Sequence, residues 1–326
     1  MRTCLGLTFQ TPKATSNDNA IFLLFWLHGK YKSFMRDNVS QKKGFFCRIE
    51  SMDRRWIFLA ITLATALPFV TTFSIRANPG EETLRFDDAL VRAIDKGMPV
   101  IVGVDFGPQT MSEMEPLLLS VMHRLFESKT PTIFLTFMTE SAAPVREYLA
   151  SMEKRYDLKY GVDYVFLGYA SSFAFTIYGM GTSIGSYFHA DDRGTALSEL
   201  PIMKGVENYK DVSAVINIAS NAMPKFWISY GVAPYNFDLL VGCTAVQATD
   251  YYPFLQTGQV DGLLAGGRAG AEYEGLLVDK GVISETGDAT RGLGSQSMAL
   301  IAVLAFIVLG NISYFAARVE KKRGRG

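Results

Sequence analysis

The sequence predicts an α/β fold: a doubly wound, mostly parallel sheet of about five strands, flanked by an N-terminal and a C-terminal transmembrane helix. Three observations indicate this fold class. Short runs rich in β-branched and aromatic residues alternate with helical patterns between residues 77 and 295. The runs are apolar almost throughout, which is typical of strands covered on both faces. Two uncharged stretches, each long enough to cross a bilayer, bracket this region.

The composition limits the class of protein. The chain has 326 residues, of which 48% are hydrophobic and 20% charged, and this balance excludes a disordered chain and a polytopic transporter. Lys plus Arg and Asp plus Glu are equal, at 32 each, so net charge gives no argument for a nucleic-acid partner. Cys243 is the only cysteine between the two uncharged stretches, so no internal disulfide can form there.

Residues 1 to 51 have no regular hydrophobic period, and their apolar stretch at 21 to 27 is too short to span a membrane. Met52, followed by Asp53, Arg54 and Arg55, is typical of the start of a membrane anchor. We therefore expect residues 1 to 51 to be either a disordered cytoplasmic arm or a mispredicted extension upstream of the true start.

The first uncharged stretch, at 56 to 75, lies in an anchor predicted at 52 to 76. At about 1.5 Å per residue, such a helix spans the roughly 30 Å hydrocarbon core of a bilayer. A cleaved secretory signal is the alternative interpretation, because basic residues precede the run. The run is longer than the usual signal, however, and no clean small-x-small cleavage site follows it. We expect a retained signal-anchor helix.

The second uncharged stretch predicts a transmembrane helix at 296 to 318, followed by a basic tail at 319 to 326. Arg54 and Arg55 precede the first stretch. By the positive-inside rule, both termini are cytoplasmic and the α/β domain at 77 to 295 is extracytoplasmic. The lipid bilayer is therefore a predicted partner. Binding of anionic lipid by the tail is the alternative to a simple stop-transfer role.

Five apolar runs are predicted strands, at residues 99 to 106, 132 to 138, 163 to 169, 213 to 220 and 238 to 246. Helical patterns accompany them, at 86 to 96, 112 to 127, 141 to 156, 222 to 230 and 263 to 279. This alternation predicts parallel strands joined by crossover helices. It resembles the architecture of solute-binding and flavodoxin-like domains, without a motif that would assign residues.

The helix predicted at 263 to 279 contains several glycines, each of which costs a helix up to about 1 kcal/mol. We expect close packing against the sheet or a second subunit to be the reason. Glu272 and Glu274 should lie on different faces of this helix, one of them in contact with solvent. The aromatic cluster at 251 to 254 is expected to fill the core, with a pocket wall as the alternative.

In doubly wound sheets, ligands bind beyond the carboxyl ends of the strands. This rule predicts that the ligand-binding residues are Asp105, Gln109, Glu140, Ser171, Asn221, Cys243 and Thr244. The alternative for each is a turn former or a helix cap. We expect an alanine at Asp105 or Thr244 to change ligand affinity and to leave the fold intact.

Three other patterns carry possible chemistry. The glycines of YGMGTSIG, at 178 to 185, indicate a phosphate loop or a tightly packed connector, and no strand leads directly into them. His189, Asp191 and Asp192 form a metal site, an acid/base pair or a polar loop, and a full zinc site would need more ligands. Cys243 is either a nucleophile paired with His189 or a buried structural thiol. The residues assign no metal and no cofactor.

The leading hypothesis for function is a non-enzymatic binding or scaffold component of an envelope complex, anchored in the membrane. Its partners would be other membrane proteins or further copies of the chain. The alternative is a membrane-tethered, hydrolase-like enzyme that uses His189, Asp191, Asp192 or Cys243. The sequence contains no H-E-x-x-H motif of a known metallohydrolase.

Overall fold

The computed structural model describes residues 54–70, 77–284 and 287–323. The chain divides into two compact units, and the larger, Leu59–Ala302, contains the sheet with its flanking helices. The predictions for residues 1 to 51 and for the end of the first uncharged stretch lie outside the described residues.

One sheet of six strands, all parallel, forms the centre of the described domain. The strands are β1 (Val100–Asp105), β2 (Thr132–Thr136), β3 (Tyr164–Tyr169), β4 (Ala214–Ala219), β5 (Leu239–Cys243) and β6 (Gly262–Ala265). Nearly all strand residues are buried, as the apolar runs predicted. The prediction of a parallel α/β sheet is therefore confirmed.

The strand order is β3-β2-β1-β4-β5-β6, so the direction of winding reverses between β1 and β4. Val100 of β1 pairs with Thr132 of β2 on one side and with Ala214 of β4 on the other. The carboxyl ends of all six strands consequently lie at the same edge of the sheet. The loops at this edge are the region where the sequence predicted ligand binding.

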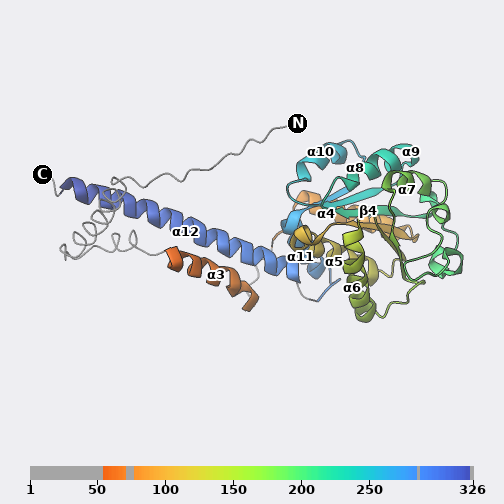
Figure 1. Ribbon diagram of the computed structural model, residues 1–326, viewed down its shortest axis with the longest axis horizontal. Coiled ribbons are helices and arrows are strands. Elements are labelled where there is room, and N and C mark those ends of the chain that lie inside the picture. Colours follow the sequence, from red (N-terminus) through yellow and green to blue (C-terminus); the bar gives the residue numbers. More distant parts are fainter. Residues whose placement is uncertain (1–53, 71–76, 285–286, 324–326) are drawn as a thin grey trace, which may run out of the picture. The chain divides into compact units, whose positions relative to one another are not determined.

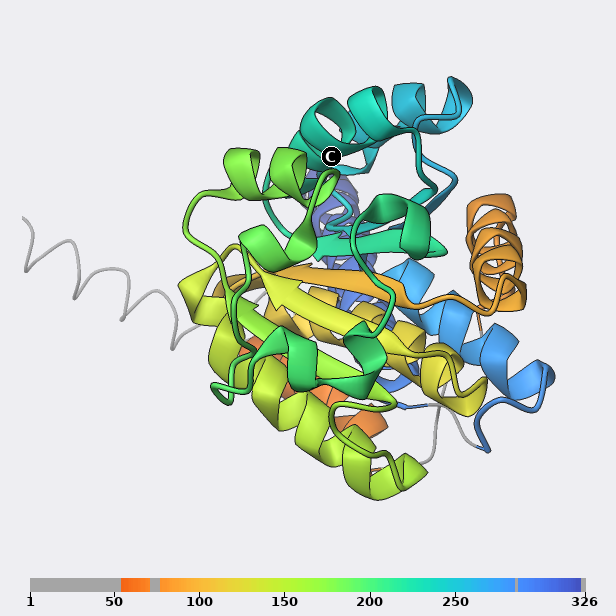
Figure 2. The same cartoon turned by 90° about the vertical axis from the view of Figure 1, so that its right-hand side faces the viewer.

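Helices cover both faces of the sheet (Figures 1 and 2). One face packs against α4 (Glu81–Asp95), α5 (Met111–Glu127), α6 (Thr139–Tyr156) and α11 (Gly266–Asp279). Their apolar residues recur at helical spacing and enter one continuous core with the strands. The short 3₁₀ turn η1 (Pro108–Thr110) joins β1 to α5.

Shorter elements cover the opposite face, where Trp227 is fully buried among them. The helices there are α7 (Phe173–Met180), α8 (Met223–Trp227), the π-helical turn η6 (Ile228–Val232), α9 (Ala233–Tyr235) and α10 (Ala248–Gln256). Four 3₁₀ turns also lie between β3 and β4, namely η2 (Ile184–Ser186), η3 (Leu197–Glu199), η4 (Pro201–Met203) and η5 (Tyr209–Asp211). Tyr251 of α10 is fully buried, in agreement with the core interpretation of the aromatic cluster, whereas Tyr252 is partly exposed.

The sixth strand is a correction to the sequence analysis, which counted about five strands and assigned residues 263 to 279 to one helix. Residues 262 to 265 form β6, which pairs with β5, and the helix begins only at Gly266. A Cβ at Gly262 would lie 2.7 Å from the Cα of Phe86, so this glycine permits α4 to approach the strand. Gly270, inside α11, faces Pro116, Leu117 and Ala289. Close helix packing thus accounts for both glycines.

α12 (Asp288–Arg323) contains the segment Ala289–Phe315, which is long and apolar enough to span a membrane. It is the one such helix among the described residues. α3 (Arg54–Val70) contains a shorter apolar part, Arg55–Ala66, so a second span is not shown there. The C-terminal part of the predicted membrane attachment therefore has structural support, whereas the orientation stays a prediction.

The first turn of α12 is bound by a carboxylate from α11. Glu274 accepts hydrogen bonds from the backbone N–H groups of Gly287, Ala289 and Thr290 and from the Thr290 hydroxyl, at 2.8 to 3.1 Å. A carboxylate at this position satisfies N–H groups that have no partner within the helix and interacts favourably with the helix dipole. The apolar helix is thus joined to the sheet domain at its first turn.

Candidate functional site

Asp105 ends β1 at the point where the winding reverses, and its side chain is fully buried. Its carboxylate accepts hydrogen bonds from the Phe137 N–H at 2.7 Å, the Asn217 side-chain amide at 2.8 Å and the Thr136 hydroxyl at 3.3 Å. Burial raises the pKa of this carboxyl from 3.8 to about 6, although these hydrogen bonds lower it. Asp105 therefore joins β1, β2 and β4 from inside the core.

This burial contradicts the expectation that Asp105→Ala would leave the fold intact. An alanine would leave the Phe137 N–H and the Asn217 amide buried with one acceptor fewer. Each unsatisfied buried group costs about 1–3 kcal/mol. The physical reason for the error is that Asp105 is the last residue of the strand rather than the first of the loop.

The other predicted binding residues lie at the same edge of the sheet. Gln109 and Glu140 flank Gly107, since an oxygen of each lies 2.6 Å from the position of a Cβ on that glycine. The Asn221 side chain accepts a hydrogen bond from the N–H of Met223, the first residue of α8. Ser171 is exposed beyond β3.

Thr244 follows β5 and is buried, with its hydroxyl 3.2 Å from the Gln247 side chain. Cys243, the last residue of β5, has no exposed surface. Burial raises the pKa of its thiol to about 12, so the reactive thiolate is not populated near neutral pH. These properties are those of a structural thiol.

His189 and Cys243 lie at separate parts of the domain. The loop that contains His189 is attached to β3, because the Asp192 N–H donates to the Phe166 carbonyl. The strand order places β2, β1 and β4 between β3 and β5. At about 4.8 Å per strand, this corresponds to roughly 19 Å. The arrangement gives no support to a nucleophile and base formed by these two residues.

The two carboxylates next to His189 hold the loop together. Asp191 accepts hydrogen bonds from the Tyr160 hydroxyl and from the N–H groups of Arg193 and Thr195. Asp192 forms a two-point ion pair with Arg146, both distances being 2.6 Å. Within the described part of the chain, no group of three His, Cys, Asp or Glu side chains could hold a metal ion.

The glycines at 178 to 185 are closely packed. A Cβ at Gly179 would lie 1.8 Å from the ring of Tyr187, and one at Gly181 would lie 2.1 Å from the ring of Tyr235. Aromatic rings thus occupy the space beside both glycines. This packing supports the connector interpretation over the phosphate loop.

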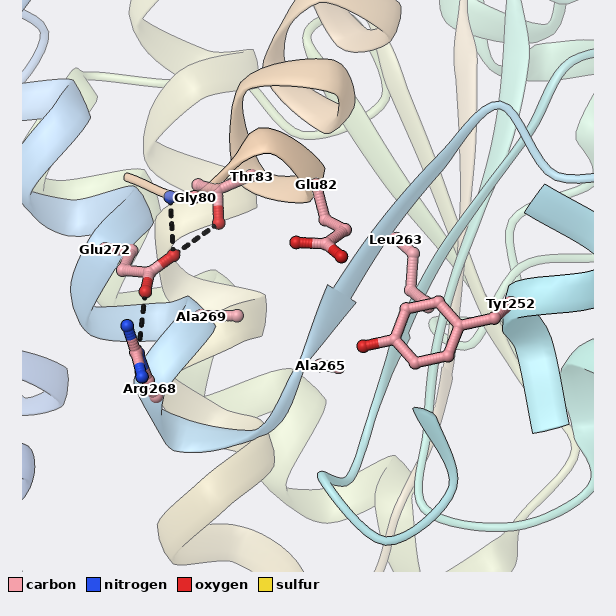
Figure 3. A pocket seen from close by; sticks show the side chains of 9 residues that line it. All are labelled: Gly80, Glu82, Thr83, Tyr252, Leu263, Ala265, Arg268, Ala269 and Glu272. Atoms are coloured by element: carbon pink, nitrogen blue, oxygen red, sulfur yellow. Dashed lines mark hydrogen bonds and ion pairs between the residues drawn. The ribbon is translucent and has the colours of Figure 1, made fainter. Parts of the chain in front are cut away.

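A cavity of about 340 Å³ lies at the carboxyl end of β6, between the starts of α4 and α11 and the side of α10 (Figure 3). Its polar lining comes from Glu82, Thr83, Tyr252, Arg268 and Glu272. Gly80, Leu263, Ala265 and Ala269 complete the wall.

The polar groups that line this cavity differ in the number of hydrogen bonds that they already form within the protein. Glu272 is buried, and it accepts hydrogen bonds from the Gly80 N–H and the Thr83 hydroxyl, each at 2.9 Å, and from Arg268 Nε at 2.8 Å. Arg268 has 78% of its side chain exposed. Among the described residues, neither the Glu82 carboxylate nor the Tyr252 hydroxyl has a hydrogen-bond partner. Figure 3 shows both groups pointing toward the same space.

Local geometry at the β6–α11 turn places Arg268. Gly266 has φ of 76°, which favours glycine, and a Cβ there would lie 2.7 Å from Ala245 and 2.9 Å from the Glu113 carboxylate. The same carboxylate accepts a hydrogen bond from the Ala245 N–H at 2.7 Å. The turn therefore packs against the loop after β5 and the first turn of α5. Arg268, in the first turn of α11, lies beside the cavity.

A second cavity, of about 460 Å³, lies next to the first and shares Arg268 with it. It extends to the N-terminal part of α5, with Ser112 and Glu113, and to the start of α12, with Ala289 and Gln296. Both cavities lie at the carboxyl-end edge of the sheet, but beyond β5 and β6 rather than at the reversal between β1 and β4.

No known family, curated protein or solved structure matches this chain. The assignment of a site therefore depends on the geometry of the chain itself.

The sequence analysis did not select Glu82 or Arg268, and it considered Tyr252 only within the aromatic cluster at 251 to 254, where a pocket wall was the alternative to the core. Recognition of GLLA as a sixth strand would have placed Arg268 just beyond a carboxyl end, where the same rule applies. Both Glu272 and Glu274 are buried, so the expectation that one of them contacts solvent is wrong. The two carboxylates accept hydrogen bonds from different elements. Glu272 accepts from the start of α4, and Glu274 accepts from the start of α12.

Proposed function

We propose that this chain is a membrane-anchored binding protein whose α/β domain recognises a small polar ligand at the carboxyl-end edge of the sheet and does not cleave it. The observation that carries this proposal is the pair of adjacent cavities that share Arg268. They combine a few polar groups with apolar walls, as small-molecule sites do.

The proposal includes two anchors, residues 56 to 75 and α12, with both termini in the cytoplasm and the domain outside. The basic residues Arg54, Arg55 and Arg318 support this orientation. The hydrogen bonds between Glu274 and the first turn of α12 support a domain held at the membrane. A role within an envelope complex, alongside other membrane proteins or further copies of the chain, belongs to the same proposal.

A comparison of binding with turnover tests the proposal. The full-length chain in nanodiscs is incubated with a pool of amino acids, peptides, sugars and nucleotides, separated by gel filtration, and the retained compounds are identified by mass spectrometry. We expect at least one compound to be retained with its mass unchanged. Empty nanodiscs are the control.

Two results would contradict this function. One is that the chain retains no compound beyond the empty nanodisc. The other is the appearance of a hydrolysis product whose formation stops in Cys243→Ala or His189→Ala while the melting temperature stays the same. The second result would favour the hydrolase alternative.

A further inference from the structure

We propose that the cavity beside β6 binds a small zwitterion whose ammonium and carboxylate groups lie at opposite ends, such as a dipeptide or an ω-amino acid. The inference rests on the proposed binding function and names the ligand chemistry of its site. Its basis is the juxtaposition of Arg268 with Glu82 and Tyr252 across an apolar wall (Figure 3).

Arg268 is suited to the carboxylate end of the ligand. Its Nε donates to Glu272 at 2.8 Å, which fixes the plane of the guanidinium group beside the cavity. The side chain is 78% exposed, so donors beyond Nε remain accessible to a ligand. A guanidinium group with two parallel donors matches a carboxylate in geometry as well as in charge.

Glu82 is suited to the ammonium end. The lining contains two carboxylates and one guanidinium, so a ligand that brings a positive group lowers the local charge imbalance. Glu272 already accepts three hydrogen bonds. Glu82 is exposed and, among the described residues, has no hydrogen-bond partner. Tyr252, a residue that is 37% exposed, supplies its hydroxyl oxygen as another acceptor for an ammonium group, which has three donors.

The size and the walls of the cavity limit the part of the ligand between its charges. A volume of about 340 Å³ lies near the lower end of small-molecule sites, which range over about 300–1,000 Å³. Leu263, Ala265 and Ala269 offer apolar contact between the charged ends. A short aliphatic body with a charge at each end therefore fits this lining.

Isothermal titration calorimetry on the full chain in nanodiscs tests the assignment with three matched probes. Alanyl-leucine carries both charges, N-acetyl-alanyl-leucine lacks the ammonium, and alanyl-leucinamide lacks the carboxylate. We expect alanyl-leucine to bind and each of the other two to bind about tenfold more weakly or worse, because each leaves one charged partner without its counterpart.

Two substitutions link each charge to its residue. Glu82→Gln should weaken the binding of alanyl-leucine about tenfold, and this variant should bind alanyl-leucine and the N-acetyl probe with similar affinity. Arg268→Gln should weaken the binding of alanyl-leucine by the same factor, and it should bind alanyl-leucine and the amide probe with similar affinity. Glu81→Gln changes an exposed neighbour that does not line the cavity, and it should bind like the wild type. Since Arg268 also contacts Glu272, melting temperatures check the fold, and Arg268→Lys is the conservative second variant.

The inference fails if the three probes bind equally, or if Glu82→Gln behaves like Glu81→Gln. It also fails if alanyl-leucine does not bind while the metabolite pool is still retained. That result would leave the proposed binding function in place with another ligand class. Failure of the chain to retain any compound would overturn both.

Discussion

Replacing the buried carboxylate at the centre of the sheet should change how stability depends on pH. Asp105 is fully buried, and its pKa rises from 3.8 to about 6 on folding. A raised pKa means that the folded state binds the proton more tightly than the unfolded state does. The stability contributed by this proton is complete below pH 3.8 and is lost as the pH rises through about 6.

The size of the effect follows from this shift. At 1.36 kcal/mol per pKa unit, a shift of about two units corresponds to about 3 kcal/mol. Asp105→Asn removes the titration and keeps the shape. Part of this effect already occurs below pH 4. Relative to the wild type, the free energy of unfolding of this variant should therefore increase by about 2.4 kcal/mol between pH 4 and pH 7.

Urea unfolding of the full chain in detergent, followed by the fluorescence of buried Trp227, gives this free energy. The quantity to compare is the free energy of unfolding of Asp105→Asn minus that of the wild type. Burial lowers the pKa of His123 to about 4, so this histidine makes the stability of both proteins rise with pH, and the subtraction removes its contribution. Asp88→Asn, at an exposed carboxylate on α4, is the control. A difference between Asp105→Asn and the wild type that stays constant from pH 4 to pH 7 would refute the reasoning.

The remaining predictions concern α12, the buried carboxylate of Asp87, the cysteine and topology. Glu274→Ala removes four hydrogen bonds to the start of α12 and should cost about 2 kcal/mol or more, with faster proteolysis near residue 285 than in Glu274→Gln. Asp87→Ala leaves the buried Tyr273 hydroxyl and the partly exposed Lys280 without their carboxylate and should lower the free energy of unfolding by about 1–3 kcal/mol; an unchanged free energy of unfolding would contradict this. Cys243 should resist iodoacetamide until urea unfolds the domain, and labelling of the native chain would show that the thiol is accessible. Protease added to spheroplasts should cut residues 77 to 295 and spare the tail after Arg318, whereas cleavage of the tail alone would reverse the predicted orientation.

Local pattern was sufficient for most of the fold. Each of the first five strands lies within an apolar run, so their existence and parallel arrangement could be predicted from the sequence, although the runs extend beyond the strand ends. The apolar helix at the C-terminus was predictable for the same reason, since length and composition alone define it. β6 was missed because a strand of four residues, beginning with Gly262, is too short to show the alternation of a strand. It also continues directly into a helix.

Tertiary structure decided which polar groups are available for chemistry. By sequence alone, nothing separates the acidic residues Asp105, Glu272 and Glu82 from one another. Burial and hydrogen-bond partners separate them: Asp105 ties three strands together, Glu272 is saturated by three donors, and Glu82 stays exposed beside a cavity. The residues that make up this site are distant in sequence, from Gly80 to Glu272, and only the pairing of β6 with β5 and the packing of α4 against it bring them together. No sequence period encodes such a contact, because it depends on where two helices and a strand meet.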